Sequence, residues 1–184
     1  MADTKSHIPS LRFAAIFSQQ VSAIDWAVQQ CSQQWGAVVK QTKDLAFDVT
    51  SFYDESMGDQ LWKRLVAFEG LVDPTQLVDS KLLSNRWENE FRDQGNDWVT
   101  RPLNIDPGYL TEAKVVLMTT KDRDHRIYID QGIYAEITLT YLLPGKWVAH
   151  RWTYPDYRNA VYHDFFFECR DYLRNCLQQQ NSTN

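Results

Sequence analysis

The chain has 184 residues, a length that suits one domain. Its 19 Lys and Arg are outnumbered by 24 Asp and Glu, and the net charge of −5 argues against nonspecific binding to nucleic-acid backbones. Apolar residues make up 43% and aromatic residues 14%, which suits a large rigid core, while only 7 Gly and 6 Pro argue against a disordered or loop-rich chain.

The first third of the chain predicts a tail, a strand and a helix. Residues 1–9 are polar without a hydrophobic period, which predicts a flexible tail. The apolar run 11–17 predicts a buried strand. Segments 37–40 and 45–53 are typical of extended chain. A helix ended by Gly36 is predicted between these strands, because apolar residues recur at spacings of three and four: Val21, Ile24, Val28, Cys31 and Trp35.

Two helices are predicted in the middle of the chain. The first lies within 54–72, with Leu61, Leu65 and Phe68 as its apolar stripe. The second occupies 73–93, where Asp73 can cap the helix and Pro74 fits its first turn. Three polar residues follow the edge of its stripe, an edge that is usually solvated and less often functional: Lys81, Asn85 and Glu88.

The C-terminal half predicts a sheet followed by a helix. Asp106-Pro107-Gly108 indicates a turn, because Pro sets φ and Gly accepts a positive φ. Residues 114–152 alternate as four strands. A last helix is predicted over about 157–178, with Cys169 and Cys176 on its buried face, and 179–184 is predicted to be a second flexible tail. The fold expected over 10–178 is a single α+β domain: a mainly antiparallel, twisted sheet of five or six strands with helices packed on one or both faces.

The cysteines and the apolar runs indicate where the protein works. Cys31, Cys169 and Cys176 form no CxxC pair, and an odd, scattered set in a sequence without a recognisable signal peptide indicates reduced thiols in the cytoplasm. The longest apolar run is far shorter than the roughly 20 residues that cross a bilayer. We therefore expect a soluble cytoplasmic protein with no membrane contact. The sequence indicates no oligomeric state.

The hairpin His125–Tyr141 can be given a register. A three-residue loop over 130–132 places Tyr128 opposite Tyr134 and Arg126 opposite Glu136, whereas a shorter loop would mix apolar and polar faces. By the same reasoning, a turn at 144–145 places Leu139 opposite His150, and a turn at 121–124 pairs the strand before it with the strand after it. One face of the sheet then carries Thr119, Arg126, Tyr128, Tyr134, Glu136, Thr138, Arg151 and Thr153, with Val115 and Leu117 as apolar patches.

A face of Tyr, Arg and Thr is typical of recognition surfaces. The alternatives are an exposed face whose Arg126–Glu136 ion pair is worth a few tenths of a kcal/mol, or a face covered by a helix. His125 and His150 fall on the opposite, core face, where a hydrogen-bonded structural histidine is the commoner reading. Asp122 and Asp124 beside His125 resemble an ordinary acidic surface turn more than a metal site, and no metal site is predicted.

The leading functional hypothesis is a binding or enzymatic pocket for a small anionic ligand, such as a nucleotide or phosphorylated metabolite. Lys121, Arg126 and Arg158 would hold its charge, and Tyr128, Tyr134 and Tyr154 would form the walls. Glu136 would orient Arg126 or act as a base, and His125 would carry protons. The rival hypothesis is a noncatalytic module whose Tyr/Arg-rich face docks a protein partner or a second copy of the chain. The sequence does not decide whether the protein is an enzyme, and it indicates no cofactor.

Three stretches of the sequence resemble a known family: FDVTSFYDESMG, LNIDPGYLTEAKVVLMTTKDRDHRIYIDQGIYAEITLTY and WTYPDYR. They are similar to the bacterial family called domain of unknown function 4416, over about Leu11 to Leu173. The resemblance implies no reaction. Some members carry a GTP-binding label, which the missing GxxxxGK[ST] loop does not support; GxGxxG, GxSxG and HExxH are missing too. The matching stretches suggest a site because they are rich in polar residues: Asp48, Tyr53, Glu55, Asp106, Tyr109, Lys114, Lys121, Asp122, His125, Arg126, Tyr128, Tyr134, Glu136, Tyr154, Asp156 and Arg158.

Overall fold

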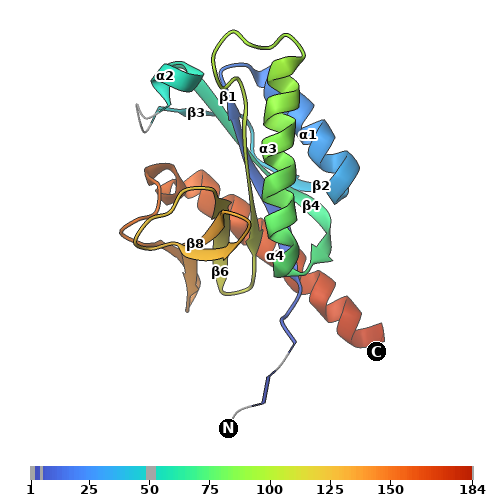
Figure 1. The fold of residues 1–184 in the computed structure, drawn as a ribbon. Coiled ribbons are helices and arrows are strands. Elements are labelled where there is room, and N and C mark those ends of the chain that lie inside the picture. Colours follow the sequence, from blue (N-terminus) through green and yellow to red (C-terminus); the bar gives the residue numbers. More distant parts are fainter. Residues whose placement is uncertain (1–2, 5, 49–52, 184) are drawn as a thin grey trace.

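The computed structural model describes residues 3–4, 6–48 and 53–183, so parts of the two expected tails and of the extended stretch 45–53 lie outside the described residues. Within them the chain forms one α+β domain with a single antiparallel sheet and helices on both faces, which confirms the predicted class (Figure 1). The described part holds nine strands, more than the five or six expected. The elements are β1 Ser10–Ser18, α1 Val21–Trp35, β2 Val38–Gln41, β3 Leu45–Phe47, α2 Asp54–Met57, β4 Leu61–Val72, η1 Pro74–Gln76, α3 Leu77–Asp93, β5 Asn104–Leu110, β6 Lys114–Thr119, β7 Ile127–Asp130, β8 Ile133–Leu142, β9 Lys146–Ala149, η2 Pro155–Arg158 and α4 Ala160–Thr183.

Helices cover both faces of the sheet. Ala14 and Ile16 of β1 pack with α1 and α3, whereas Phe13 and Ala15 pack with α4. The strand is therefore buried along its whole length, as its apolar run predicts. Figure 1 shows α1 and α3 along one side of the sheet and α4 crossing to the C-terminus, beyond the helix end expected near residue 178.

The helix predicted within 54–72 is wrong for most of its length. Only the short α2 is helical, and residues 61–72 form β4, the neighbour of β1. Leu65 and Ala67 face α4, while Val66 and Phe68 face α1. A strand that is buried on both faces has no alternation of apolar and polar residues, so its apolar positions imitate a helical stripe.

Asp106-Pro107-Gly108 forms no turn but lies inside β5, which corrects the prediction. All of β5 pairs with β1, yet its ladder with β6 holds only from Gly108 to Leu110. Pro107 has no N–H to give to a neighbouring strand. Gly108 allows close approach, since a Cβ there would collide with the Val116 carbonyl oxygen and lie 2.7 Å from the Phe13 ring.

On the N-terminal side of Gly108, where β5 and β6 are no longer paired, the sheet consequently divides into two arms. One arm holds β2, β3, β4, β1 and β5, and the other holds β6, β8, β7 and β9 (Figure 1). On the first arm, the segment from Asn104 to Pro107 keeps only β1 as a strand neighbour. On the second, Met118 and Thr119 of β6 pair with β8. This division creates the space in which the candidate site lies.

The hairpin register is confirmed in its body and wrong at its tip. Tyr128 pairs with Tyr134, and Ile127 with Ala135, as predicted. Asp130 pairs with Ile133 across a bulge, so the loop has two residues rather than three. Gln131 and Gly132 both have positive φ, 49° and 77°, the conformation of the tight turn that suits the twist of a hairpin.

Of the other two turns, the one at 144–145 is present with a register shifted by one residue, and the one at 121–124 is not a hairpin turn. β6 pairs with β8 and not with β7, so residues 121–124 form a crossing loop instead of a hairpin turn. β7 and β9 both pair with the outer edge of β8, and Leu139 lies opposite Ala149 rather than His150. A bulge in the β6–β8 ladder also reverses the faces, which leaves Ile137 41% exposed and Leu139 fully buried.

The cysteine prediction holds for one residue of two. Cys169 is buried, as is Cys31, and burial raises the pKa of both thiols. Cys176 is only half-buried, near the outer end of α4, so its assignment to the core was wrong.

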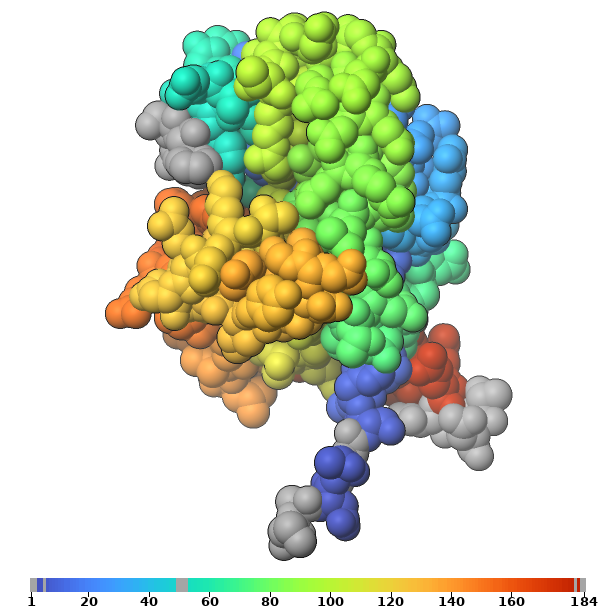
Figure 2. Space-filling model, in the orientation of Figure 1, coloured from blue at the N-terminus to red at the C-terminus, as the bar shows by residue number. Residues whose placement is uncertain are grey.

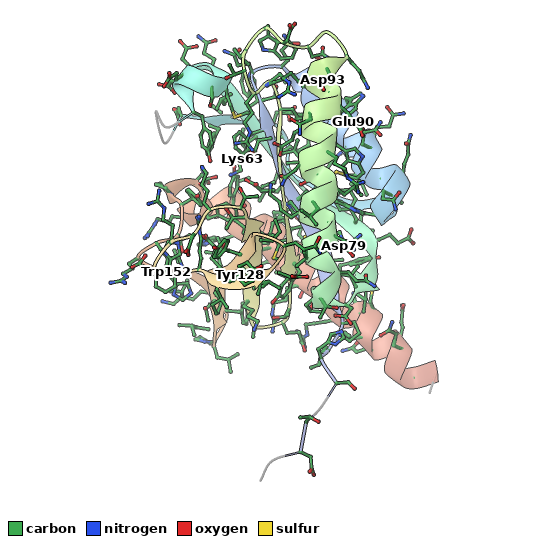
Figure 3. All side chains as sticks on the ribbon, in the orientation of Figure 1. Lys63, Asp79, Glu90, Asp93, Tyr128 and Trp152 are labelled. Atoms are coloured by element: carbon green, nitrogen blue, oxygen red, sulfur yellow. The ribbon has the colours of Figure 1, made fainter. Side chains whose placement is uncertain are left out.

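A buried ion pair ties η2 to the sheet. Lys63 Nζ of β4 lies 2.6 Å from Asp156 Oδ2, and the two side chains are 6% and 7% exposed. The rings of Phe17, Phe47 and Tyr157 lie 4.6–5.4 Å from the ammonium. Lys63 sits near the centre of the molecule in Figure 3, between the two arms. The pair therefore positions the 150–158 segment that forms one wall of the site.

We predict that Lys63→Met lowers the free energy of unfolding by about 3–5 kcal/mol, because the Asp156 carboxylate is left buried without its cation. The double variant Lys63→Met/Asp156→Leu should recover most of that loss, since no charge then remains buried. Urea denaturation measures both.

Lys40→Met is the matched control, because Lys40 pairs with Glu168 at 3.0 Å with 37% and 61% of the side chains exposed. Its loss should stay below about 1 kcal/mol. Equal losses for Lys63→Met and Lys40→Met would contradict the anchoring role.

Candidate functional site

Two adjoining pockets open where the arms of the sheet separate. The first, here called the basic pocket, has a volume of about 280 Å³ and is lined by Tyr53, Lys121, Arg123, His125, Arg126, Trp152 and Tyr154. The second, called the polar pocket, has about 290 Å³ and is lined by Tyr53, Lys81, Asn85, Glu88, Asn89, Arg101, Asn104, Asp106, Thr119, Thr120, Lys121 and Tyr154. In Figure 2 the surface is notched where the yellow segment near residue 120 meets green α3 and the teal segment around α2.

Arg126 connects the crossing loop to β8 and to the 150–158 segment. Its Nε donates to Glu136 Oε2 at 2.7 Å, its Nη1 to the Lys121 carbonyl at 3.0 Å and its Nη2 to the Tyr154 hydroxyl at 3.1 Å. The side chain is only 4% exposed. Burial alone would lower the pKa of Arg126, but its bond and charge pairing with Glu136 raise it, so the cation is secured.

Glu136 lies behind the pocket wall, with its side chain 1% exposed. Its Oε2 also lies 3.3 Å from His125 Nε2, while His125 Nδ1 lies 3.0 Å from Asp124 Oδ1. His125 stacks on Trp152 with ring centroids 5.3 Å apart. The imidazole is thus held between two carboxylates and an indole, at the border of the pocket.

Trp152 closes a gap in the outer edge of β8. β7 pairs with this edge up to Ala135, and β9 pairs with it from Leu139, which leaves 136–138 without a neighbouring strand there. Trp152 Nε1 donates to the Ile137 carbonyl at 3.0 Å, and Thr153 Oγ1 donates to the Thr138 carbonyl at 2.6 Å. These bonds satisfy the open backbone and fix the indole as a wall.

Positive charge gathers in the basic pocket. Lys121, Arg123 and Arg126 line it together with His125. Burial lowers the pKa of Lys121, and the nearby charges of Arg101, Arg126 and Arg123 lower it further, against the opposing effect of Asp106. A bound anion would relieve this repulsion, so the electrostatics of the pocket favour an anionic ligand.

Apart from Lys121, which it shares with the basic pocket, the polar pocket carries charges that are paired with one another. Lys81 Nζ donates to Asp106 Oδ1 at 2.8 Å and to the Ile105 carbonyl at 3.0 Å. Arg101 Nη2 donates to Glu88 Oε2 at 3.0 Å. Burial would raise the pKa of Asp106, but Lys81, Arg101 and the amide of Asn104 lower it to about 2, so the carboxylate stays ionised. The solvated edge expected at Lys81 is wrong, because Lys81 is 3% exposed.

The structure brings together some of the predicted site residues and separates others. Lys121, His125, Arg126 and Tyr154 line the basic pocket, and Glu136 supports it. The rest lie elsewhere: Tyr128 and Tyr134 pack edge to face at the exposed end of the hairpin, 5.4 Å apart, and Arg158 donates to the His150 carbonyl. Figure 3 shows Tyr128 and Trp152 in the arm that holds β6 and β8.

Sequence reasoning missed Arg123 and Trp152 as pocket residues. Both lie within the stretches that resemble the family, but neither was among the polar residues singled out there. They meet because the crossing loop and the 150–154 segment converge at the edge of β8. Tyr53 and Asp106 carried a signal, since both lie in polar stretches that resemble the family. Lys81, Asn85 and Glu88 of α3 line the polar pocket beside these residues. Predicted strand pairing gives no information on where a helix packs, so it could not indicate this.

The described residues contain no group of three or more His, Cys, Asp or Glu side chains placed to hold a metal ion. In the same part of the chain, no helix combines the length and apolar character needed to cross a bilayer.

Comparison with known proteins gives one match. The family model described as Domain of unknown function (DUF4416) matches residues 9–172, which is most of the chain. No curated protein and no solved structure matches significantly.

We predict that Arg126→Ala lowers the free energy of unfolding by about 3–5 kcal/mol, because it leaves the Glu136 carboxylate buried without its cation. Adding Glu136→Gln should restore part of the stability by removing that charge. Thermal and urea denaturation measure the effect.

Arg151→Ala serves as the control, since the Arg151–Asp124 contact is 3.4 Å long and 80% and 75% of its two side chains are exposed. It should change stability little. A small loss for Arg126→Ala would show that this arginine does not fasten the loop.

Proposed function

The chain belongs to this family, whose description assigns no activity, and we propose that it binds a small anionic ligand, such as a nucleotide or phosphorylated metabolite, in the basic pocket. The observation that carries the proposal is the convergence of Lys121, Arg123 and Arg126, with His125, on one pocket in a chain whose net charge is −5. An acidic protein repels anions at long range, so a local cluster of cations is useful where it grips a particular ligand.

The hydrogen bonds of the pocket indicate different roles for its cationic residues. The donors of Arg126 already hold Glu136, the Lys121 carbonyl and Tyr154, so its main role in the proposal is to shape the pocket. Lys121 and Arg123 would supply most of the charge that meets the ligand, together with the remaining N–H groups of Arg126. Trp152, Tyr53 and Tyr154 would enclose the less polar part of the ligand.

The same wall offers groups for proton transfer. His125 borders the pocket, and Glu136 and Asp124 hold its two ring nitrogens. A histidine in this setting would carry a proton to or from a bound substrate if the protein catalyses a reaction. The free thiols of Cys31, Cys169 and Cys176 support a reducing cytoplasmic compartment for this activity.

We predict that Lys121→Ala and Arg123→Ala each abolish ligand-induced thermal stabilisation by sulfate, phosphate or nucleotides. An anion present at 100 times its dissociation constant stabilises the wild-type fold by about 2.7 kcal/mol, which thermal denaturation detects easily. The exposed Arg86 lies on α3 outside both pockets, so Arg86→Ala should respond as wild type does. A wild-type protein that no anion stabilises would refute the proposal.

We also predict that sulfate binding weakens as the pH rises into the alkaline range. The pKa of Lys121 is lowered from 10.5, and a bound anion favours the charged amine. Above the lowered pKa, binding must take up a proton, so the affinity falls. Sulfate keeps its own charge over this range. Isothermal titration of Lys121→Arg, which stays charged, should show a much flatter pH dependence; an equally steep one would assign the effect to another group.

An interaction module is the second candidate, supported by the outer edge of the sheet. β7 is an edge strand, and Ile127, Tyr128 and Ile129 are 70%, 56% and 45% exposed. Such an edge can add a strand from a second copy of the chain. Sedimentation velocity over a range of concentrations tests this self-association: Ile127→Lys should abolish it, whereas a monomeric wild type would rule out pairing of two copies through β7.

A further inference from the structure

We propose, on the premise of the proposed function, that the ligand is a phosphate ester of a sugar or similar polyol. Its phosphate would bind in the basic pocket, and its hydroxyl groups would bind in the polar pocket. The proposal follows from the contrast between two pockets that one ligand can occupy together.

The two pockets adjoin. Tyr53, Lys121 and Tyr154 line both of them, so these residues form their junction. Tyr154 is held there by Arg126 Nη2 at 3.1 Å, and Lys121 Nζ lies 5.8 Å from the centre of the Tyr53 ring. A ligand whose phosphate reaches Lys121 would therefore extend past the junction into the polar pocket.

Apart from Lys121 at the junction, the charged side chains of the polar pocket balance one another and leave no cation for a second anion. Its cations Lys81 and Arg101 are paired with Asp106 and Glu88 at 2.8 and 3.0 Å. The pKa of Asp106, lowered to about 2, keeps this balance at every physiological pH. A neutral group is accordingly the chemistry that this compartment accommodates without disturbing its ion pairs.

The polar pocket instead offers many groups that form neutral hydrogen bonds. Asn85 and Asn89 lie one turn apart on α3, and Thr119 and Thr120 face them from the end of β6. Amides and hydroxyls both donate and accept, which matches the double capacity of a sugar hydroxyl. Asp106 adds acceptor capacity, because its side chain is 31% exposed and each carboxylate oxygen has a second lone pair.

A flat nucleobase fits this compartment less well. Bases bind between aromatic or apolar side chains, and most drug-like ligands occupy predominantly apolar pockets. The aromatic residues that line the polar pocket are Tyr53 and Tyr154, both at its junction with the basic pocket. The remaining lining is polar, as a hydroxyl-rich ligand requires.

Isothermal titration with graded probes tests the proposal: inorganic phosphate, ethyl phosphate, glycerol phosphate, ribose phosphate, glucose phosphate and adenosine monophosphate. The affinity should rise from ethyl phosphate to the sugar phosphates by about three- to tenfold for each hydrogen bond gained. Equal affinity for ethyl phosphate and the sugar phosphates would overturn the assignment. So would adenosine monophosphate binding more tightly than ribose phosphate, which would place a base in the site.

Two variants locate the hydroxyl groups. Asn85→Leu and Asn89→Ala should each weaken ribose phosphate about three- to tenfold and leave ethyl phosphate unchanged. Asn175→Ala, at an exposed position on α4, is the matched control and should change neither. If Asn85→Leu and Asn89→Ala weaken neither probe, the polar pocket holds no hydroxyl groups and the inference fails.

The two proposals fail in distinguishable ways. If phosphate and ethyl phosphate bind and Lys121→Ala removes that binding, the basic pocket is an anion site whatever the sugar phosphates do. Failure of the hydroxyl dependence then rejects only the present inference. If no phosphate compound binds wild type, both proposals are rejected.

Discussion

The separation of β5 from β6 beyond Gly108 is the constraint on which the rest of the structure depends. Pro107 cannot donate to a neighbouring strand, and Gly108 lets β6 approach only at the point where the ladder ends. A continuous ladder would place β6 directly along Asp106 and close the space between the arms. Because the ladder stops, α3 from one face and the crossing loop from the other arm reach the same opening.

An opening in a sheet becomes a defined site only if its walls are fixed, and two buried ion pairs do this. Lys63–Asp156 anchors η2 to the first arm, and Arg126–Glu136 anchors the crossing loop to the second. Such pairs add little net stability, because desolvation offsets most of their attraction. Their geometry is nevertheless specific, since any shift leaves a buried charge without its partner. The site therefore gains rigidity from interactions that contribute little to the free energy of folding.

The sequence predicted what depends on local patterns. The cap of η1 at Asp73, the helical stripe of α3 and the pairing of Tyr128 with Tyr134 all follow from neighbouring residues. Predictions failed where a distant partner decides the outcome: β4 is a strand because β1 and both helical layers bury it, and β6 skips β7 to pair with β8. The site divides likewise. Lys121, Arg123, His125 and Arg126 lie close in sequence, whereas Trp152 and the residues of α3 join them only through the folded sheet.

Arg126 shows why residue type alone does not assign a role. A mid-strand arginine on a polar face was expected to grip a ligand, yet three of its donors bind the protein itself and only 4% of the side chain is exposed. Its charge is balanced by that of Glu136, which reduces the field that it contributes to the pocket. Lys121 and Arg123 line the pocket within the frame that Arg126 holds. The rigidity of the pocket and its positive charge thus reside in different residues. A ligand can therefore neutralise the positive charge without breaking the hydrogen bonds that keep the pocket rigid.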